Sequence, residues 1–169
     1  LKTFVDNYNF PAVSTRAANV YGVGQQLYRI IPRTIFYIKK RKKLQLHGGG
    51  YSERSFIHIK DVADATLKIA LDGVIGESYH ISTKSTITIR DLVSLVCNKM
   101  EVDFSDNVDI VGERMGKDAA YFLDSNKIRE TLGWEENISL EQGIEETIDW
   151  VNSNMQLLEQ ETDYYIHKP

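Results

Sequence analysis

Arg54 is the residue whose chemical type and setting point most clearly to a ligand. It follows an alternating strand, Leu44–His47, and three consecutive glycines, Gly48–Gly50. Glycine backbone carries no side chain, so a ligand can approach it closely. The planar guanidinium group of arginine can form two parallel charged hydrogen bonds to a phosphate. The segment therefore fits either a phosphate-binding site or a hairpin that carries a surface arginine.

Other residues that could carry chemistry lack the spacing that their chemistry requires. Gly22 and Gly24 follow a predicted strand, but Leu27 stands where a dinucleotide-binding turn has its third glycine. The four histidines show no metal-ligand spacing, so we predict no metal site. Cys97 falls on or beside an apolar helix face, which argues against a Cys–His nucleophile pair. None of these groups predicts a catalytic centre.

Length and composition bound the class of protein. The chain has 169 residues, of which 42% are hydrophobic, enough to bury one core in one compact domain. Its net charge of -4 argues against a general nucleic-acid binder. A single cysteine, and no apolar run of membrane-spanning length, indicate a cytoplasmic protein without a membrane partner.

The basic run at 39–43 is the exception to the acidic composition. It consists of four lysines and one arginine at the expected end of a helix. Cations there complement the helix dipole, so the run is typical of a solvated helix C-terminus. The alternative is a local positive field that attracts a small polyanionic ligand.

The hydrophobic periodicity predicts strands and helices in alternation, which is typical of an α/β fold. Thr88 with Asp91, and Ser139 with Gln142, have the spacing of capping boxes at helix starts. Strands are predicted at 12–17, 44–47, 55–59, 77–82 and 108–111. Helices are predicted from about 31 into the basic run, at 61–71, after 88, at 124–133 and after 139, with Asp61 capping or opening the second of them.

The two ends of the chain differ from the middle. Residues 1–8 have helical apolar spacing without a cap, so we expect the last turns of a helix that begins elsewhere, and hence a fragment. Residues 156–169 are expected to be a tail. We therefore predict that residues 1–155 form the main structural part of the chain.

Two ordered motifs bring these residues together. The first is Arg16-x-x-Asn19-x-Tyr21-Gly22, then Ile31-Pro32, then Gly48-x-Gly50-x-x-x-Arg54-x-Phe56-x-x-x-x-Asp61. The second is Arg114-x-Gly116-x-Asp118-x-x-Tyr121-x-x-Asp124, then Lys127 and Leu132-Gly133-Trp134. Together they resemble the extended short-chain dehydrogenase/reductase enzymes, the nucleotide-sugar epimerases and dehydratases. The second motif is most similar to the dTDP-glucose 4,6-dehydratase branch.

The resemblance implies a fold and a set of ligand contacts. The chain would hold the last strands of a Rossmann-type NAD(P)-binding fold and the small C-terminal substrate-binding subdomain. Asn19 would contact the sugar or the diphosphate of a nucleotide-diphosphate sugar, and Arg29 would lie near the diphosphate. Arg54 would bind the diphosphate, and Arg114 would close on the nucleotide from the other side.

The resemblance also implies a strand that binds the nucleotide base. Departures from the family's motifs leave the identity of the base and of the sugar undecided. Leu44 and Leu46 would run along the nucleotide base, and His47 stands where dehydratases often place a stacking tyrosine. Met115 replaces a proline of the branch. Ser55-Phe56 replaces Asp-Trp, a form closer to UDP-sugar epimerases and decarboxylases.

The family's chemical residues have no counterpart in this sequence. The resemblance implies a glycine-rich NAD turn and a Tyr-x-x-x-Lys pair, whose tyrosinate removes a hydroxyl proton while NAD accepts the hydride. We find neither on a predicted strand or helix, so we expect no catalytic residue in this chain, no retained NAD and no activity by the chain alone. The parent would be an NAD-dependent 4,6-dehydratase, expected to be a homodimer. The alternatives are a UDP-sugar 4-epimerase or decarboxylase, and a non-catalytic nucleotide-sugar-binding subunit.

Overall fold

The structure, a computed structural model, describes residues 1–113, 116 and 118–165. The helices are α1 Lys2–Tyr8, α2 Ile30–Lys39, α3 Ile59–Asp72, α4 Ile89–Lys99, α5 Phe104–Asn107, α6 Asn126–Leu132, α7 Leu140–Ser153 and α8 Met155–Leu158, with a 3-10 turn at Gly48–Gly50. The strands are β1 Ser14–Ala17, β2 Asn19–Tyr21, β3 Leu44–His47, β4 Glu53–Arg54, β5 Phe56–His58, β6 Ser78–Ile81, β7 Ile87–Thr88, β8 Val108–Val111 and β9 Ala120–Tyr121. None of the helices within these residues is long and apolar enough to cross a membrane.

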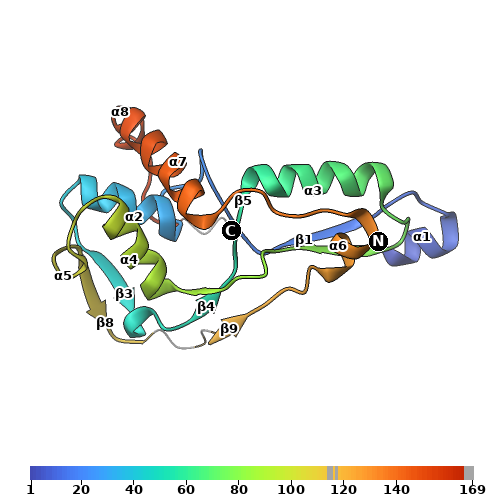
Figure 1. Cartoon of the computed structure of the whole chain (residues 1–169), viewed down its shortest axis with the longest axis horizontal. Coiled ribbons are helices and arrows are strands. Elements are labelled where there is room, and N and C mark those ends of the chain that lie inside the picture. Colours follow the sequence, from blue (N-terminus) through green and yellow to red (C-terminus); the bar gives the residue numbers. More distant parts are fainter. Residues whose placement is uncertain (114–115, 117, 166–169) are drawn as a thin grey trace.

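The molecule is elongated, with α1, α3 and α6 at one end and α2, α4 and α5 at the other (Figure 1). At the first end β1 pairs in parallel with β6, and β2 pairs in parallel with β5. Helix α3 connects β5 to β6, so it joins the two parallel pairs. Its buried Ala65 and Ile69 pack in one core with Ile57, Tyr79, Ile81, Ile128 and Trp134.

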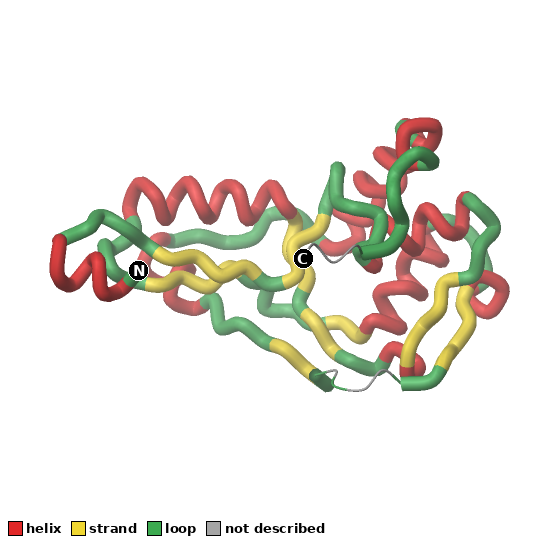
Figure 2. The backbone as a smooth tube through the Cα atoms, turned by 180° about the vertical axis from the view of Figure 1, so that it is seen from behind, coloured by secondary structure: helices red, strands yellow, loops and turns green. Residues whose placement is uncertain are grey.

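At the other end β3 pairs in parallel with β8, and Figure 2 shows these two strands side by side. Helix α4 packs its apolar face on β3 and β8, where Val93 and Cys97 are fully buried. The α4 cap is the predicted one, since the Thr88 hydroxyl accepts a hydrogen bond from the Asp91 N–H at 3.0 Å. Burial raises the pKa of the Cys97 thiol, which leaves it an unreactive core residue.

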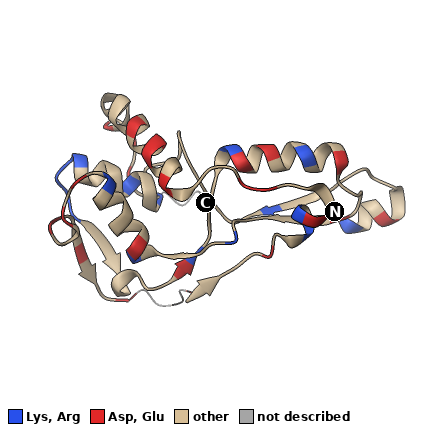
Figure 3. Ribbon diagram, in the orientation of Figure 1, with Lys and Arg blue, Asp and Glu red and all other residues tan. Residues whose placement is uncertain are grey.

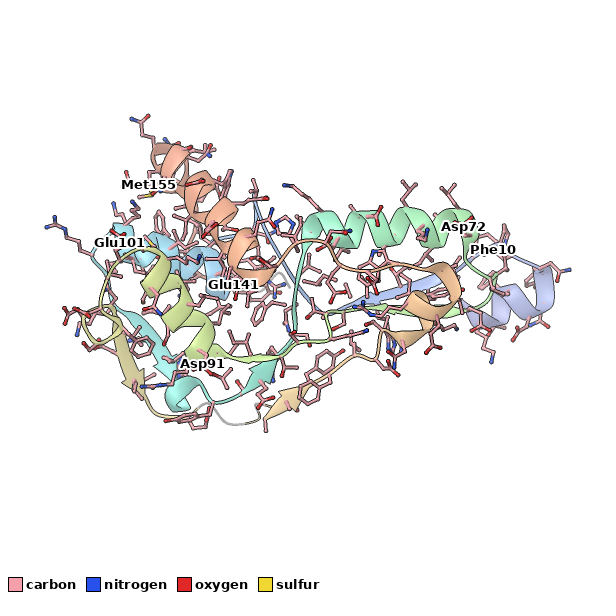
Figure 4. All side chains as sticks on the ribbon, in the orientation of Figure 1. Phe10, Asp72, Asp91, Glu101, Glu141 and Met155 are labelled. Carbon is pink, nitrogen blue, oxygen red and sulfur yellow. The ribbon has the colours of Figure 1, made fainter. Side chains whose placement is uncertain are left out.

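Helix α7 packs against α2, and Figure 4 shows side chains filling the space between them, with Glu141 at the start of α7. The predicted cap is confirmed, because the Ser139 hydroxyl accepts a hydrogen bond from the Gln142 N–H at 3.1 Å. A Cβ atom at position 143 would lie 2.3 Å from the Tyr21 hydroxyl oxygen. Glycine at this position therefore permits α7 to approach β2.

Helix α3 begins two residues before the predicted start. Its N-cap is His58, whose Nδ1 atom accepts a hydrogen bond from the Lys60 N–H at 3.3 Å. Asp61 therefore does not cap the helix. It is buried in the first turn, where its carboxylate accepts hydrogen bonds from the N–H groups of Asn137 at 3.0 Å and Ile138 at 3.2 Å. Asp61 thus fixes the segment that leads into α7.

Candidate functional site

Two adjoining cavities lie between β2, β3, β4 and the start of α2. The Asn19 cavity has a volume of about 660 Å³ and is lined by residues that include Asn19 and Arg29. The β3 cavity has a volume of about 550 Å³ and is lined by all four residues of β3. Five residues line both cavities: Tyr28, Ile30, Arg33, Arg54 and Ile89. The cavities therefore form one groove with Arg33 and Arg54 at the junction.

Arg54 lies on β4, which pairs with β7 on one side and β9 on the other. Its guanidinium group donates hydrogen bonds to the carbonyl oxygens of Glu53 at 2.7 Å and Asp118 at 2.8 Å. These contacts orient the group, but carbonyl oxygens do not neutralise its charge. Arg54 is thus a positioned cation in the groove.

Asn19 is held by its pairing with β5. Its N–H donates to the Ser55 carbonyl at 3.2 Å, and its side-chain Nδ2 donates to the same oxygen at 3.0 Å. The side-chain amide is therefore fixed at the wall of the Asn19 cavity. Its Oδ1 atom remains as an acceptor, so the group can accept a hydrogen bond from a ligand hydroxyl.

Arg33 is a groove residue that the sequence motifs did not indicate. Its Nη2 atom donates to the Tyr37 hydroxyl at 3.3 Å, and its guanidinium carbon lies 5.2 Å from the centre of that ring. Its Nε atom is buried and has no hydrogen-bond partner among the described residues. A buried donor without a partner carries a desolvation cost that an anionic ligand could offset. Its position four residues after Arg29, on one helix face, is the signal that could have found it.

Arg29 is the N-cap residue of α2 and lines the Asn19 cavity. Its guanidinium carbon lies 5.4 Å from the centre of the Tyr28 ring. Arg29, Arg33 and Arg54 thus bring three cations to one groove, and the described residues that line it include one carboxylate residue, Asp118. This balance favours an anionic ligand.

Strand β3 contributes two kinds of residue to its cavity. Leu44 and Leu46 are each 3% exposed and pack in the core, whereas Gln45 and His47 are exposed. The His47 Nδ1 atom lies 3.2 Å from the Gly112 carbonyl oxygen, which fixes the imidazole ring at the end of the strand. Among the described strands β3 pairs with β8 alone, so its other edge presents backbone N–H and C=O groups.

The three glycines before Arg54 form a tight turn. All three have positive φ values, and none of them lines either cavity. At position 50, where φ is 75°, a Cβ atom would lie 2.9 Å from the Arg90 backbone nitrogen. The close approach of a ligand to these glycines stays a prediction. Their backbone is left-handed, and Gly50 packs against α4.

Arg114 and Tyr21 are the remaining motif residues that bear on the groove. Arg114 lies outside the described residues, whereas Gly116 and Asp118 of the same motif line the β3 cavity. Tyr21 lines the Asn19 cavity, and burial, with nearby carboxylates that include Asp61, strongly raises the pKa of its hydroxyl. This shift favours the protonated form of the Tyr21 hydroxyl.

Comparisons with known proteins identify the family of the chain. The family described as GDP-mannose 4,6 dehydratase matches residues 1–147. The chain is 32% identical over 159 residues to the dTDP-D-glucose 4,6-dehydratase of Mus musculus, which covers 91% of this chain and 44% of that protein. It is 34% identical over 148 residues to a trifunctional UDP-glucose 4,6-dehydratase/UDP-4-keto-6-deoxy-D-glucose 3,5-epimerase/UDP-4-keto-L-rhamnose-reductase of Arabidopsis thaliana, covering 88% of this chain and 22% of that protein.

A solved structure confirms the predicted fold class. The crystal structure of DesIV, a dTDP-glucose 4,6-dehydratase from Streptomyces venezuelae with NAD and TYD bound, superposes with a TM-score of 0.89 at 28% identity. The match covers 94% of this chain and 49% of that one. The chain therefore has the Rossmann-like α/β fold of this enzyme. It spans about half, or less, of the length of each of these three proteins.

Proposed function

Because the chain belongs to the GDP-mannose 4,6 dehydratase family, we propose that it supplies the nucleotide-sugar-binding half of an NAD-dependent dTDP-glucose 4,6-dehydratase. One observation carries the proposal. Arg54 lies where the Asn19 cavity meets the β3 cavity, so a single ligand could span both and place its charge beside this arginine. A nucleotide-diphosphate sugar has this order of groups, with the diphosphate between the base and the sugar.

Each part of the groove suits one part of that ligand. The free edge of β3 offers backbone hydrogen-bonding groups to a base, and His47 offers an aromatic ring beside it. Arg54 and Arg33 would hold the diphosphate through charged hydrogen bonds. Asn19, whose Oδ1 remains an acceptor, would hold a sugar hydroxyl. Arg29, at the same end as Asn19, would contact the diphosphate from the sugar side.

These contacts would bind and orient the substrate rather than transform it. The diphosphate keeps its charge throughout a reaction at the sugar, so Arg54 would stabilise the bound substrate and the transition state equally. Its loss would therefore raise KM more than it lowers kcat. We assign no catalytic residue to this chain, and Arg114 remains a prediction for the opposite side of the nucleotide.

The described residues around Gly22 and Gly24 do not fit an NAD pyrophosphate. The glycines at 22 and 24 lead into α2 only at Ile30, whereas a dinucleotide turn opens a helix directly. A Cβ atom at Gly22 would lie 2.7 Å from an Ile59 side-chain atom, so Gly22 serves packing against α3. We therefore propose that the hydride chemistry and its cofactor site belong to a part of the enzyme outside this chain.

Product analysis on the complete enzyme would test this function. A dehydratase would convert dTDP-glucose to a 4-keto-6-deoxy sugar, whereas an epimerase or a decarboxylase of the same family would not. The Ser55-Phe56 pair, which differs from the Asp-Trp of dehydratases, keeps a UDP-sugar epimerase or decarboxylase as the second candidate. The purified chain alone should bind dTDP-glucose without hydride transfer. Hydride transfer by the chain alone would contradict the assignment, and failure to bind any nucleotide sugar would refute it.

A further inference from the structure

The basic run at 39–43 faces the last described segment of the chain. Figure 3 shows the positive charges that gather where α2 ends. The Lys40 ammonium lies 2.6 Å from the Glu159 carboxylate, and the Lys42 ammonium lies 3.6 Å from the Asp163 carboxylate. The run is therefore more than a solvated helix end, because two of its lysines pair with carboxylates of residues 159–165, called here the C-terminal strap.

The strap is anchored at its start by packing. Helix α8 follows α7 directly, and its Leu158 is 5% exposed in the same core cluster as Ile35 and Phe36 of α2. The chain then passes along α2 with Glu159 and Asp163 facing the lysines. Each such ion pair contributes little in water, but two pairs and a buried leucine together fix the path of a seven-residue segment.

The strap ends at the substrate groove. The Tyr165 ring lies in an edge-to-face contact with Tyr28, with ring centres 5.2 Å apart and planes at 70°. Tyr28 lines both cavities, whereas Tyr165 lines the Asn19 cavity alone. An aromatic ring of the strap thus forms part of the wall of the Asn19 cavity, beside a residue that lines both cavities.

We propose that Tyr165 is a specificity-determining residue that contacts the sugar of the bound nucleotide sugar, and that Lys40 and Lys42 hold it there through the strap. The inference rests on the proposed function, which places the base along β3 and the sugar in the Asn19 cavity. A tyrosine ring offers an apolar face and a polar hydroxyl, and this combination suits a hexose, which presents both C–H and O–H groups. Because Tyr165 lines the Asn19 cavity and not the β3 cavity, it would contact the sugar rather than the base.

The test compares dTDP-glucose with dTDP on the full chain by calorimetric titration. Tyr165→Ala should weaken dTDP-glucose binding by about two- to tenfold, the effect of one aromatic contact, and leave dTDP binding unchanged. Tyr165→Phe should keep most of the affinity for dTDP-glucose. Tyr164→Ala is the matched control, since Tyr164 is exposed and does not line the groove, and it should bind both ligands as the parent does.

Exchanging the charges of the Lys40–Glu159 ion pair tests whether the strap holds Tyr165 in place. Lys40→Glu and Glu159→Lys should each weaken dTDP-glucose but not dTDP, and the double exchange should restore the parent affinity. Equal binding of dTDP-glucose by the parent and by Tyr165→Ala would overturn the inference, as would an equal loss of dTDP affinity. A parent chain that binds neither ligand would instead overturn the proposed function itself.

Discussion

The Nη2 atom of Arg54 donates a hydrogen bond to the Asp118 carbonyl oxygen at 2.8 Å, which links β4 to the segment that enters β9. The same guanidinium group donates to Glu53 through Nη1, so the fork is held at two of its nitrogens. An arginine that is oriented by carbonyl groups and not neutralised by a carboxylate is poised for an anion. This relationship makes Arg54 the centre of the proposed site.

Replacing Arg33 should lower the affinity for the ligand without lowering the stability of the fold. Arg33→Met keeps the apolar stem but removes the charge and the buried Nε donor, which has no hydrogen-bond partner among the described residues. We expect dTDP affinity to fall roughly tenfold, while the free energy of unfolding stays equal or rises because a buried polar group without a partner is removed. Titration with dTDP and urea unfolding measure the two effects. Lower stability at unchanged affinity would show that Arg33 is structural.

Asp61 should be needed for stability and not for ligand affinity. Asp61→Ala leaves the N–H groups of Asn137 and Ile138 without their acceptor, which costs roughly 1–3 kcal/mol for each amide. Asp64→Ala, on the exposed face of the same helix, should change the free energy of unfolding by less than about 0.5 kcal/mol. Urea unfolding of the two variants makes the comparison. Equal stability of both would contradict the assigned role of Asp61.

His58 should make the stability of the fold depend on pH. Burial lowers the pKa of His58, although nearby Glu146 acts in the opposite direction. The unfolded state therefore binds this proton more tightly, so the contribution of His58 is fully present above its unfolded pKa of about 6.5 and is lost as the pH falls from there toward the lowered folded pKa.

The variant His58→Asn tests this pH dependence. Asparagine keeps a cap for α3 but does not titrate. Unfolding by urea between pH 5 and pH 8 should show a flatter stability profile for this variant than for the parent. An unchanged slope in His58→Asn would refute the role of this histidine.

Local sequence signals predicted most of the helices and strands. Elements that depend on long-range contacts could not be predicted from the sequence. The capping boxes at Thr88 and Ser139 are local hydrogen-bond patterns, and both helices begin where they indicate. Strands β2, β4, β7 and β9 were not predicted, because strands of two or three residues are defined by their partners and are too short to show an alternating pattern.

Sequence motifs indicate single positions of the candidate site, but they do not show how those positions lie in space. Asn19, Arg29 and Arg54 line one cavity, and their contact with a ligand stays a prediction. Arg33 was missed because its role depends on where α2 lies relative to β4. Tyr165 was missed because only the folded path of the chain brings it beside Tyr28, 137 positions earlier in the sequence. The spacing of Arg33 from Arg29 was a signal in the sequence, whereas the contact of Tyr165 with Tyr28 leaves no pattern in a single sequence.

The most direct test of the central claim is the affinity of the chain for dTDP before and after the change Arg54→Ala. The loss of charged hydrogen bonds to the diphosphate should weaken binding by roughly ten- to a hundredfold. Arg41→Ala, which removes the same charge from an exposed position outside the groove, should bind within about twofold of the parent. If the Arg54→Ala variant binds dTDP as tightly as the parent does, then the groove at Arg54 is not the diphosphate site.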